Sequence, residues 1–175
     1  MRKITLYTAA SLDGYIAGPN GEIDWLDSAD QPGEDYGYAA FIETIDTTIM
    51  GTATYKLAES FGGDPYPDKT NYVFTRQTPP PPDTDRWHFV NDDIVGFVRG
   101  LREAQGEGIW LVGGGQINTV MLNAGLIDEM VITMFPLVLG SGIPLFAPSA
   151  SLTHFRTVSA HAYDNGLVQW TLARA

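Results

Sequence analysis

The stretch Ile109-Trp110-Leu111-Val112-Gly113-Gly114-Gly115-Gln116 decides the fold, because a wholly apolar run passes through three glycines directly into a helix pattern. A strand without polar residues is typical of a parallel sheet that is buried on both faces. Glycines let the backbone approach a phosphate closely, and the unpaired N–H groups at a helix N-terminus favour an anion. Asn118 stands where the dinucleotide-binding G-x-G-x-x-G motif has its third glycine. Both a phosphate-binding turn and a structural tight turn are therefore compatible with this stretch.

A second strand ends in the same way, at Met50-Gly51-Thr52-Ala53-Thr54-Tyr55. Its hydroxyls and amides could hold a second phosphate, and the alternative is a plain helix N-cap by Thr52. Ligands of open α/β sheets bind at the carboxyl ends of the strands. Two such turns in one sheet would suit a dinucleotide.

Strand and helix patterns alternate along the rest of the chain, which predicts an α/β fold with a mainly parallel sheet. The Asp164-Asn165-Gly166 turn in the segment 155–172 predicts an antiparallel hairpin at the C-terminal end. We expect one domain over residues 1–175. Strands are predicted at 4–10, 47–50, 72–74, 87–90, 109–112 and 130–135, and helices at 34–45, 53–60, 93–104 and 116–123.

The composition excludes several classes of function. The 175 residues include ten Lys or Arg and 21 Asp or Glu, for a formal net charge of −11, and such a charge repels nucleic acid and anionic lipid. No apolar stretch approaches the roughly 20 residues that span a bilayer, and no signal peptide is evident. We predict a cytoplasmic protein without nucleic-acid or membrane partners. Nine acidic residues and no Lys or Arg lie between Asp13 and Asp46, which indicates either a solvated face or an acidic edge of a binding site.

Hydrolytic and metal chemistry have no visible machinery in this sequence. The chain has no cysteine, and its three histidines are interpreted as structural or surface residues. The acidic pairs Asp92-Asp93 and Asp128-Glu129 are neighbours in sequence, so on a strand their side chains would point to opposite faces, and we expect no metal site. A hydride transfer needs less, namely a cofactor, a pocket and one proton donor.

Four motifs together resemble the dihydrofolate reductase superfamily, and most closely the reductase domain of the bifunctional riboflavin-biosynthesis deaminase–reductase. The resemblance covers nearly the whole chain in order and implies a dihydrofolate-reductase-like three-layer fold. No deaminase segment precedes Met1, so a stand-alone reductase domain is expected, and the resemblance also suggests a homodimer. The motifs are Ser11-Leu12-Asp13-Gly14-Tyr15-Ile16-Ala17, Met50-Gly51-Thr52-Ala53-Thr54-Tyr55, Val112-Gly113-Gly114-Gly115, and Asp128-Glu129 followed by Pro136 to Phe146 with its Leu-Gly-Ser-Gly-Ile-Pro-Leu-Phe ending.

The resemblance implies NADPH as cofactor and assigns residues to it. Ala9 and Ile16 would flank the nicotinamide, under a loop formed by residues 12–24. The phosphates would lie against Gly51, Thr52 and Thr54, the adenosine 2′-phosphate near Thr75 and Arg76, and the pyrophosphate against Gly113, Gly114, Gly115, Gln116 and Ile117. Apart from the resemblance, few cations are available to a multiply anionic cofactor, and Lys56 could assist Arg76.

The resemblance also implies catalytic candidates. Asp35 lies at the spacing at which dihydrofolate reductases place the carboxylate that binds the pteridine ring, and Thr133 matches the hydroxyl beside it. A plain helix-start acid is the alternative for Asp35.

Two departures from the family pattern matter. Thr52 replaces the usual arginine after Met-Gly, which leaves NADH as an alternative cofactor, and Asp24-Trp25 replaces a Pro-Trp pair.

The function predicted is an NADPH-dependent reductase of a small-molecule pyrimidine- or pteridine-type heterocycle, resembling 5-amino-6-(5-phosphoribosylamino)uracil reductase. Dihydrofolate reductase is the first alternative. A non-catalytic nucleotide- or flavin-binding module on the same fold is the second.

Overall fold

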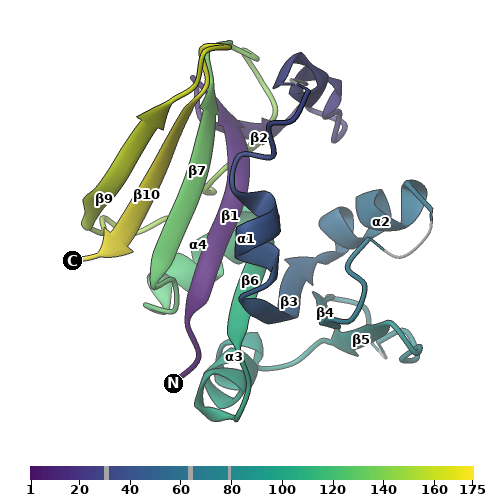
Figure 1. The fold of residues 1–175 in the computed structure, drawn as a ribbon. Coiled ribbons are helices and arrows are strands. Elements are labelled where there is room, and N and C mark those ends of the chain that lie inside the picture. The colour runs from purple at the N-terminus through teal and green to yellow at the C-terminus, as the bar shows by residue number, and fades with distance from the viewer. Residues whose placement is uncertain (30–31, 63–64, 79) are drawn as a thin grey trace.

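The computed structural model describes residues 1–29, 32–62, 65–78 and 80–175. Figure 1 shows a twisted central sheet with α1 in front of it and α4 behind it. The strands are β1 (Ile4–Ser11), β2 (Tyr15–Ala17), β3 (Ile45–Gly51), β4 (Thr70–Phe74), β5 (Trp87–Val90), β6 (Gly108–Gly113), β7 (Glu129–Phe135), β8 (Ile143–Pro144), β9 (Phe155–Ala162) and β10 (Val168–Arg174). The helices are the 3-10 helix η1 (Asp24–Ala29) and the α-helices α1 (Tyr38–Ile42), α2 (Thr52–Ser60), α3 (Ile94–Glu103) and α4 (Gly115–Asn123).

The main sheet has eight strands in the order β5-β4-β3-β6-β1-β7-β10-β9. The six strands from β5 to β7 in this order pair in parallel, and β10 pairs antiparallel with both β7 and β9. The predicted α/β fold, with its mainly parallel sheet and antiparallel C-terminal hairpin, is confirmed. Because the parallel strands run the same way, β1, β3, β4 and β6 end at one edge of the sheet.

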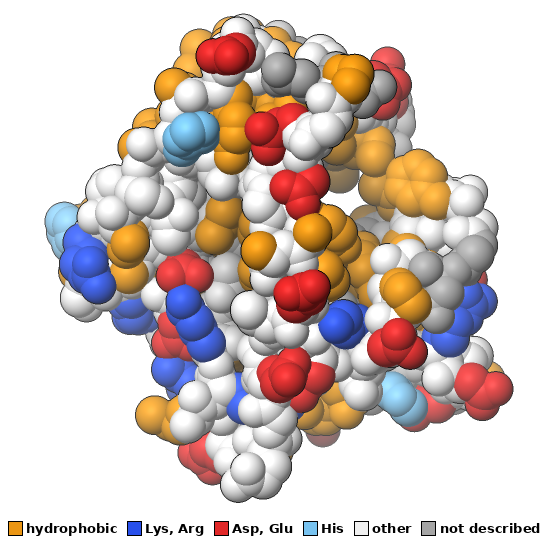
Figure 2. All heavy atoms as spheres, in the orientation of Figure 1, with side chains coloured by type: hydrophobic (Ala, Val, Ile, Leu, Met, Phe, Trp, Pro, Cys, Tyr) orange, Lys and Arg blue, Asp and Glu red, His pale blue; other side chains and the backbone are white. Residues whose placement is uncertain are grey.

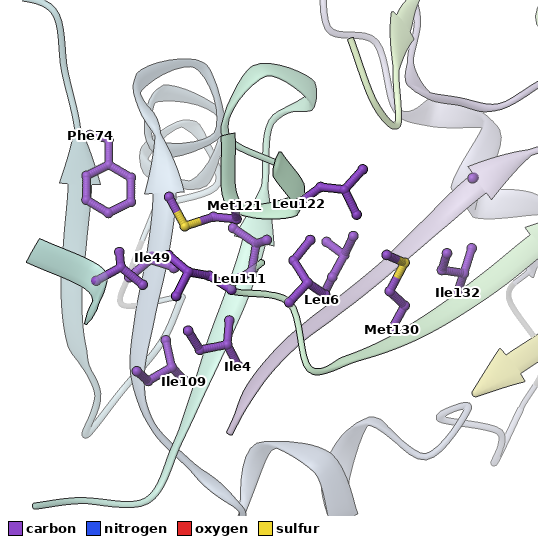
Figure 3. Packing of buried hydrophobic residues seen from close by; sticks show 14 residues of the cluster. Ile4, Leu6, Ile49, Phe74, Ile109, Leu111, Met121, Leu122, Met130 and Ile132 are labelled. Atoms are coloured by element: carbon purple, nitrogen blue, oxygen red, sulfur yellow. The ribbon is translucent and has the colours of Figure 1, made fainter. Parts of the chain in front are cut away.

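Successive side chains along each strand point to opposite faces of the sheet, and helices cover both faces. Leu6 and Leu111 belong to the larger buried cluster, which also takes in Val98 of α3 and Met121 of α4 (Figure 3). Tyr7, the next residue of β1, stacks instead on Phe41 of α1, with ring centroids 4.4 Å apart. The helices α3 and α4 therefore cover one face, and α1 and α2 lie on the other.

The predicted strands and the later helices are confirmed within a few residues. At the start of α3, Asp93 is the N-cap residue, and its carboxylate accepts from the Gly96 N–H at 3.0 Å. The predicted helix over 34–45 is wrong in extent, because only Tyr38–Ile42 is α-helical. Gly37, with a φ of 80°, precedes it, and the chain enters β3 directly after it, at Ile45. The short pair β2–β8 and the helix η1 were not predicted, because segments this short carry little periodicity.

No helix in the described ranges combines the length and the apolar character needed to cross a membrane.

Candidate functional site

The two glycine turns predicted from sequence meet at the carboxyl edge of the sheet. Gly114 lies between β6 and α4 with a φ of 103°. A Cβ atom built on it would lie 3.4 Å from the Thr54 Oγ1 and 4.0 Å from the Gly51 backbone nitrogen. The turn after β3 and the turn after β6 therefore face each other across a space that a side chain on Gly114 would enter.

The start of α4 supplies the N–H groups of this cradle. The first intrahelical bond runs from the Asn118 N–H to the Gly114 carbonyl at 2.9 Å. The amides of Gly115, Gln116 and Ile117 precede it, and such first-turn amides have no partner within the helix. They can bind an anion through backbone dipoles without a cation.

Arg76 is the cation that the structure brings to this cradle. Its exposed guanidinium donates to the Gln116 Oε1 across the gap between the segment after β4 and the first turn of α4. Thr52 begins α2 directly after β3, which neighbours β4 in the sheet. Its hydroxyl donates to the carbonyl of Phe74, the last residue of β4, at 3.1 Å. Thr75, also partly buried, accepts through its hydroxyl from the Gln77 N–H at 3.1 Å. The phosphate-side residues predicted from sequence thus lie on adjacent strand ends.

Gly115 also has a packing role that the sequence did not predict. A Cβ on this residue would lie 2.2 Å from the Pro144 carbonyl oxygen. A Cβ on Gly142, two residues before Pro144 in the Leu-Gly-Ser-Gly segment, would lie 2.1 Å from the Ala17 carbonyl oxygen. The glycines let the segment around β8 lie directly against both α4 and β2.

The loop predicted to close over the nicotinamide is partly fixed by strand pairing. Tyr15 pairs with Pro144, and Ala17 with Ile143, in the β2–β8 ladder. Asp13 ties the start of this loop to the turn after β7, because its carboxylate accepts from the N–H groups of Leu139 at 3.1 Å and Gly140 at 2.8 Å. Ile16, on β2, is partly buried and packs against the larger core cluster.

The Asp13 contacts predict an acid-sensitive loop. The hydrogen bond from the Ser11 hydroxyl, followed by those from the Gly140 and Leu139 amides, lowers the pKa of Asp13 below its ordinary 3.8. A lowered folded-state pKa stabilises the fold above the unfolded-state value, and this contribution is lost as the pH falls through the folded-state value. We expect Asp13→Asn to be less stable than the parent near about pH 7, and this difference should shrink as the pH falls below the ordinary value of 3.8.

Urea unfolding at a series of pH values from neutral to acid measures this, with Asp164→Asn in the exposed hairpin turn as the matched control. A constant stability difference between Asp13→Asn and the parent across this range would contradict it.

Asp35 caps a helix. Its exposed carboxylate accepts from the Gly37 N–H and the Ala39 N–H, each at 2.9 Å. These bonds, that from Ala39 first, lower the pKa of Asp35, so the side chain is ionised and engaged at the start of α1. Among the described residues, no hydrogen bond joins Asp35 to Thr133, and a catalytic role for this pair stays a prediction.

Thr133 is instead joined to the segment before α1 through Gln169 of β10. The Gln169 Nε2 donates to the Thr133 Oγ1 at 3.0 Å and to the Tyr36 carbonyl at 2.9 Å. Ala9 is the register partner of Thr133 on β1, so these side chains share one row across β1, β7 and β10. Sequence reasoning missed Tyr36 and Gln169, because only the antiparallel register of β10 brings them together.

Aromatic rings line the sheet beside this row. Trp110 of β6 has its ring centroid 6.5 Å from that of Tyr7, 5.8 Å from that of Tyr38 and 5.3 Å from that of Tyr66. Burial raises the pKa of Tyr7 and that of Tyr66 to about 12, so both phenols are protonated and act as neutral groups at ordinary pH. The surface beside α1 is thus suited to a flat ring.

Acidic side chains border this surface. Figure 2 shows a row of them down the middle of the molecule, over α1 and its flanking segments, beside a hollow with hydrophobic side chains around it. Lys69, a cation close to α1, is held by the carbonyls of Ile42 and Ile45 at 3.1 and 2.6 Å. The described part of this face therefore presents aromatic and acidic groups more than cationic ones.

A cavity of about 570 Å³ lies elsewhere, at the amino ends of β1, β3 and β6. Arg2 borders it, but its guanidinium is already bonded to Asp46, to the Thr47 hydroxyl at 2.6 Å and to the Glu107 carbonyl at 2.7 Å. The cavity is remote from the glycine turns and offers little unpaired polar chemistry. In the described ranges, no group of three or more His, Asp or Glu side chains is placed to hold a metal ion.

This chain is similar to several known proteins over most of its length. The model of the family described as "RibD C-terminal domain" matches residues 2–169. Two proteins of Bacillus subtilis (strain 168) are similar over most of their length: "Uncharacterized protein YwjB" is 42% identical over 159 residues, which cover 89% of this chain and 88% of YwjB. "Uncharacterized protein YyaP" is 34% identical over 182 residues, covering 96% and 93%.

Three solved structures share the fold. The "putative riboflavin biosynthesis protein" of Shewanella sp. PV-4 has a TM-score of 0.87 at 34% identity and covers 100% of this chain and 99% of its own. The diaminohydroxyphosphoribosylaminopyrimidine deaminase/5-amino-6-(5-phosphoribosylamino)uracil reductase of Thermotoga maritima has a TM-score of 0.72 at 15% identity, covering 99% of this chain and 57% of its own. Dihydrofolate reductase from Enterococcus faecalis, complexed with NADP(H) and RAB-propyl, has a TM-score of 0.68 at 18% identity, covering 98% and 96%. The last two likenesses show the fold alone.

Proposed function

Because the chain belongs to the RibD C-terminal domain family, we propose that it is a reductase of the riboflavin-biosynthesis type. It would move a hydride from NADPH to a C=N or carbonyl carbon of a substrate that carries a pyrimidine- or pteridine-type heterocycle. The observation that carries the proposal is the meeting of the two glycine turns, where Gly114 faces Thr54 and Gly51 at van der Waals distance. In this proposal residues 1–175 act as one domain.

The residues present fit a nicotinamide dinucleotide. A Cβ at Gly114 would enter the space between the turns, and the first amides of α4 supply donors for a pyrophosphate. Arg76 and the Thr54 hydroxyl add two donors from the neighbouring strand ends. When bound, the cofactor supplies the hydride, and the chain's own part is to hold it against the ring and to exclude water.

The charge of the face beside α1 supports a ring with little negative charge. Its described side chains are acidic and aromatic, and a phosphorylated substrate would need a cation there or a phosphate site elsewhere. Reduction of dihydrofolate, the alternative that depends on Asp35, is less supported, since that carboxylate caps α1.

Titration of the protein with NADPH and NADH, followed by fluorescence, tests the cofactor part of the proposal. Absence of binding to either nucleotide overturns the reductase. Consumption of NADPH with the phosphoribosylamino-uracil substrate, set against dihydrofolate, then separates the two reductases, and binding without turnover on either would favour a non-catalytic nucleotide-binding module.

Arg76 is expected to decide the preference between the two nucleotides. Arg76→Gln removes the guanidinium that we assign to the 2′-phosphate, so the Kd for NADPH should rise by about 3- to 10-fold, since an exposed charge pair contributes roughly 1 kcal/mol. The Kd for NADH should stay within twofold.

Fluorescence titration at low and high salt measures both, and Arg99→Gln on the exposed face of α3 is the matched control. An equal loss for the two nucleotides would place the 2′-phosphate elsewhere.

A further inference from the structure

The carbonyl of Tyr36 is bound by two side chains from the sheet. The Gln169 Nε2 donates to it at 2.9 Å and the Tyr7 hydroxyl donates to it at 2.8 Å. Tyr36 has a φ of 56°, a left-handed conformation that is unusual for a residue other than glycine. The two hydrogen bonds therefore hold a strained residue in one place, directly before α1.

These contacts determine the orientation of the Gln169 carboxamide. A backbone carbonyl only accepts, so the atom of Gln169 that faces Tyr36 must be the amide nitrogen. The second amide hydrogen points to the Thr133 Oγ1, 3.0 Å away. Both N–H groups of Gln169 are thus used within the protein, and its Oε1 is left as an acceptor.

Gln169 and Thr133, which lie side by side, each keep a hydrogen-bonding group that the described part of the protein does not fully use. The Gln169 Oε1 has one long contact, 3.4 Å from the Tyr163 hydroxyl, and an amide oxygen can accept two hydrogen bonds. The Thr133 hydroxyl accepts from Gln169, and among the described residues its own hydrogen has no acceptor. The pair therefore presents one acceptor and one donor, in the row that continues to Ala9.

We infer that Gln169 and Thr133 form the specificity-determining pair of the site and bind a neutral donor–acceptor edge of the heterocycle, such as the N–H and C=O of a lactam. The ring N–H would donate to the Gln169 Oε1, and the ring carbonyl would accept from the Thr133 hydroxyl. A protonated amidine edge offers two donors and would suit a carboxylate instead. Asp35, the carboxylate predicted for that purpose, is already used in capping α1.

The inference rests on the proposed function, since it takes the ring to lie beside Ala9, where the nicotinamide is expected. The inference is tested by measuring the binding of free heterocycles by calorimetry, without nucleotide. Its outcome is therefore independent of NADPH turnover. The probes are 6-aminouracil, which presents a lactam edge, and 2,4-diaminopyrimidine at a pH where that ring is protonated. We expect the parent to bind 6-aminouracil at least about tenfold more tightly, the effect of one well-made hydrogen bond.

Gln169→Glu replaces the carboxamide with a carboxylate of the same size, and it should reverse the preference between the two probes. Gln105→Glu, an exposed position after α3, is the matched control and should leave the preference unchanged.

Since Gln169→Glu also removes the donors to Tyr36 and Thr133 and could unfold the protein, Thr133→Val and Thr133→Ser form a second pair. The valine should lose about tenfold in 6-aminouracil affinity, and the serine, which keeps the hydroxyl, should retain it. A parent that prefers the protonated ring, binds neither probe, or is unaffected by Thr133→Val overturns the inference. Loss of NADPH binding with the ring preference intact would instead overturn the reductase and leave the pair standing.

Discussion

Gly114→Asp should weaken NADPH binding by about 100-fold or more, equivalent to about 2.8 kcal/mol. The new side chain would enter the space between the two glycine turns, where a Cβ already lies 3.4 Å from the Thr54 Oγ1. Its carboxylate would take up the α4 amides that we assign to the pyrophosphate, and its charge would repel the incoming phosphates. Fluorescence titration of the folded variant measures the loss.

Two comparison variants make this result interpretable. Gly114→Ala carries the same backbone strain at a φ of 103° without the charge, so it should lose much less affinity. Gly100→Asp adds the same charge on α3, where a Cβ meets open space, and it should bind NADPH like the parent. Unchanged affinity in a folded Gly114→Asp variant would show that the pyrophosphate does not lie at this turn.

Gly115→Ala should lower the free energy of unfolding by about 3 kcal/mol, the upper part of the range for overpacking a well-packed site. The added Cβ would lie 2.2 Å from the Pro144 carbonyl oxygen, and neither α4 nor the paired β2–β8 ladder can move without losing contacts. Urea unfolding of the variant and the parent measures the change.

The same change from glycine to alanine at Gly100 of α3 should raise the free energy of unfolding instead. Gly100 is a helical residue with nothing within 4 Å of its Cβ direction, so Gly100→Ala should stabilise the protein by up to about 1 kcal/mol through helix propensity alone. If Gly115→Ala were as stable as Gly100→Ala, the contact between α4 and Pro144 would not be the reason for a glycine at 115.

The neighbouring glycines Gly114 and Gly115 show how far sequence reasoning reached. The three-glycine run after an apolar strand predicted the turn and its place at a strand end. It also left open whether the turn served a phosphate or only the backbone. In the structure a Cβ on Gly115 would clash with Pro144, whereas a Cβ on Gly114 would only reach van der Waals contact with Thr54. No local sequence pattern could separate the two.

The proposed ring-binding part of the site was less predictable. Thr133 was predicted from the resemblance because it matches a hydroxyl of the family, but its hydrogen-bond partner Gln169 lies 36 residues later on an antiparallel strand. Asp35 was predicted on the same grounds, and its surroundings show a capping role. The left-handed Tyr36, whose carbonyl orients Gln169, has no signature in the sequence at all.

The amino-acid sequence by itself determined the alternation of strands and helices, the glycine turns at the strand ends and the acidic charge around α1, because these depend on periodicity, on backbone freedom and on composition. Only the tertiary structure decided which turns face each other, which glycine serves packing, and which polar side chains meet beside Ala9. Those relations depend on strand order and register, which are set by the burial of the whole core around Leu6 and Leu111 rather than by any local segment.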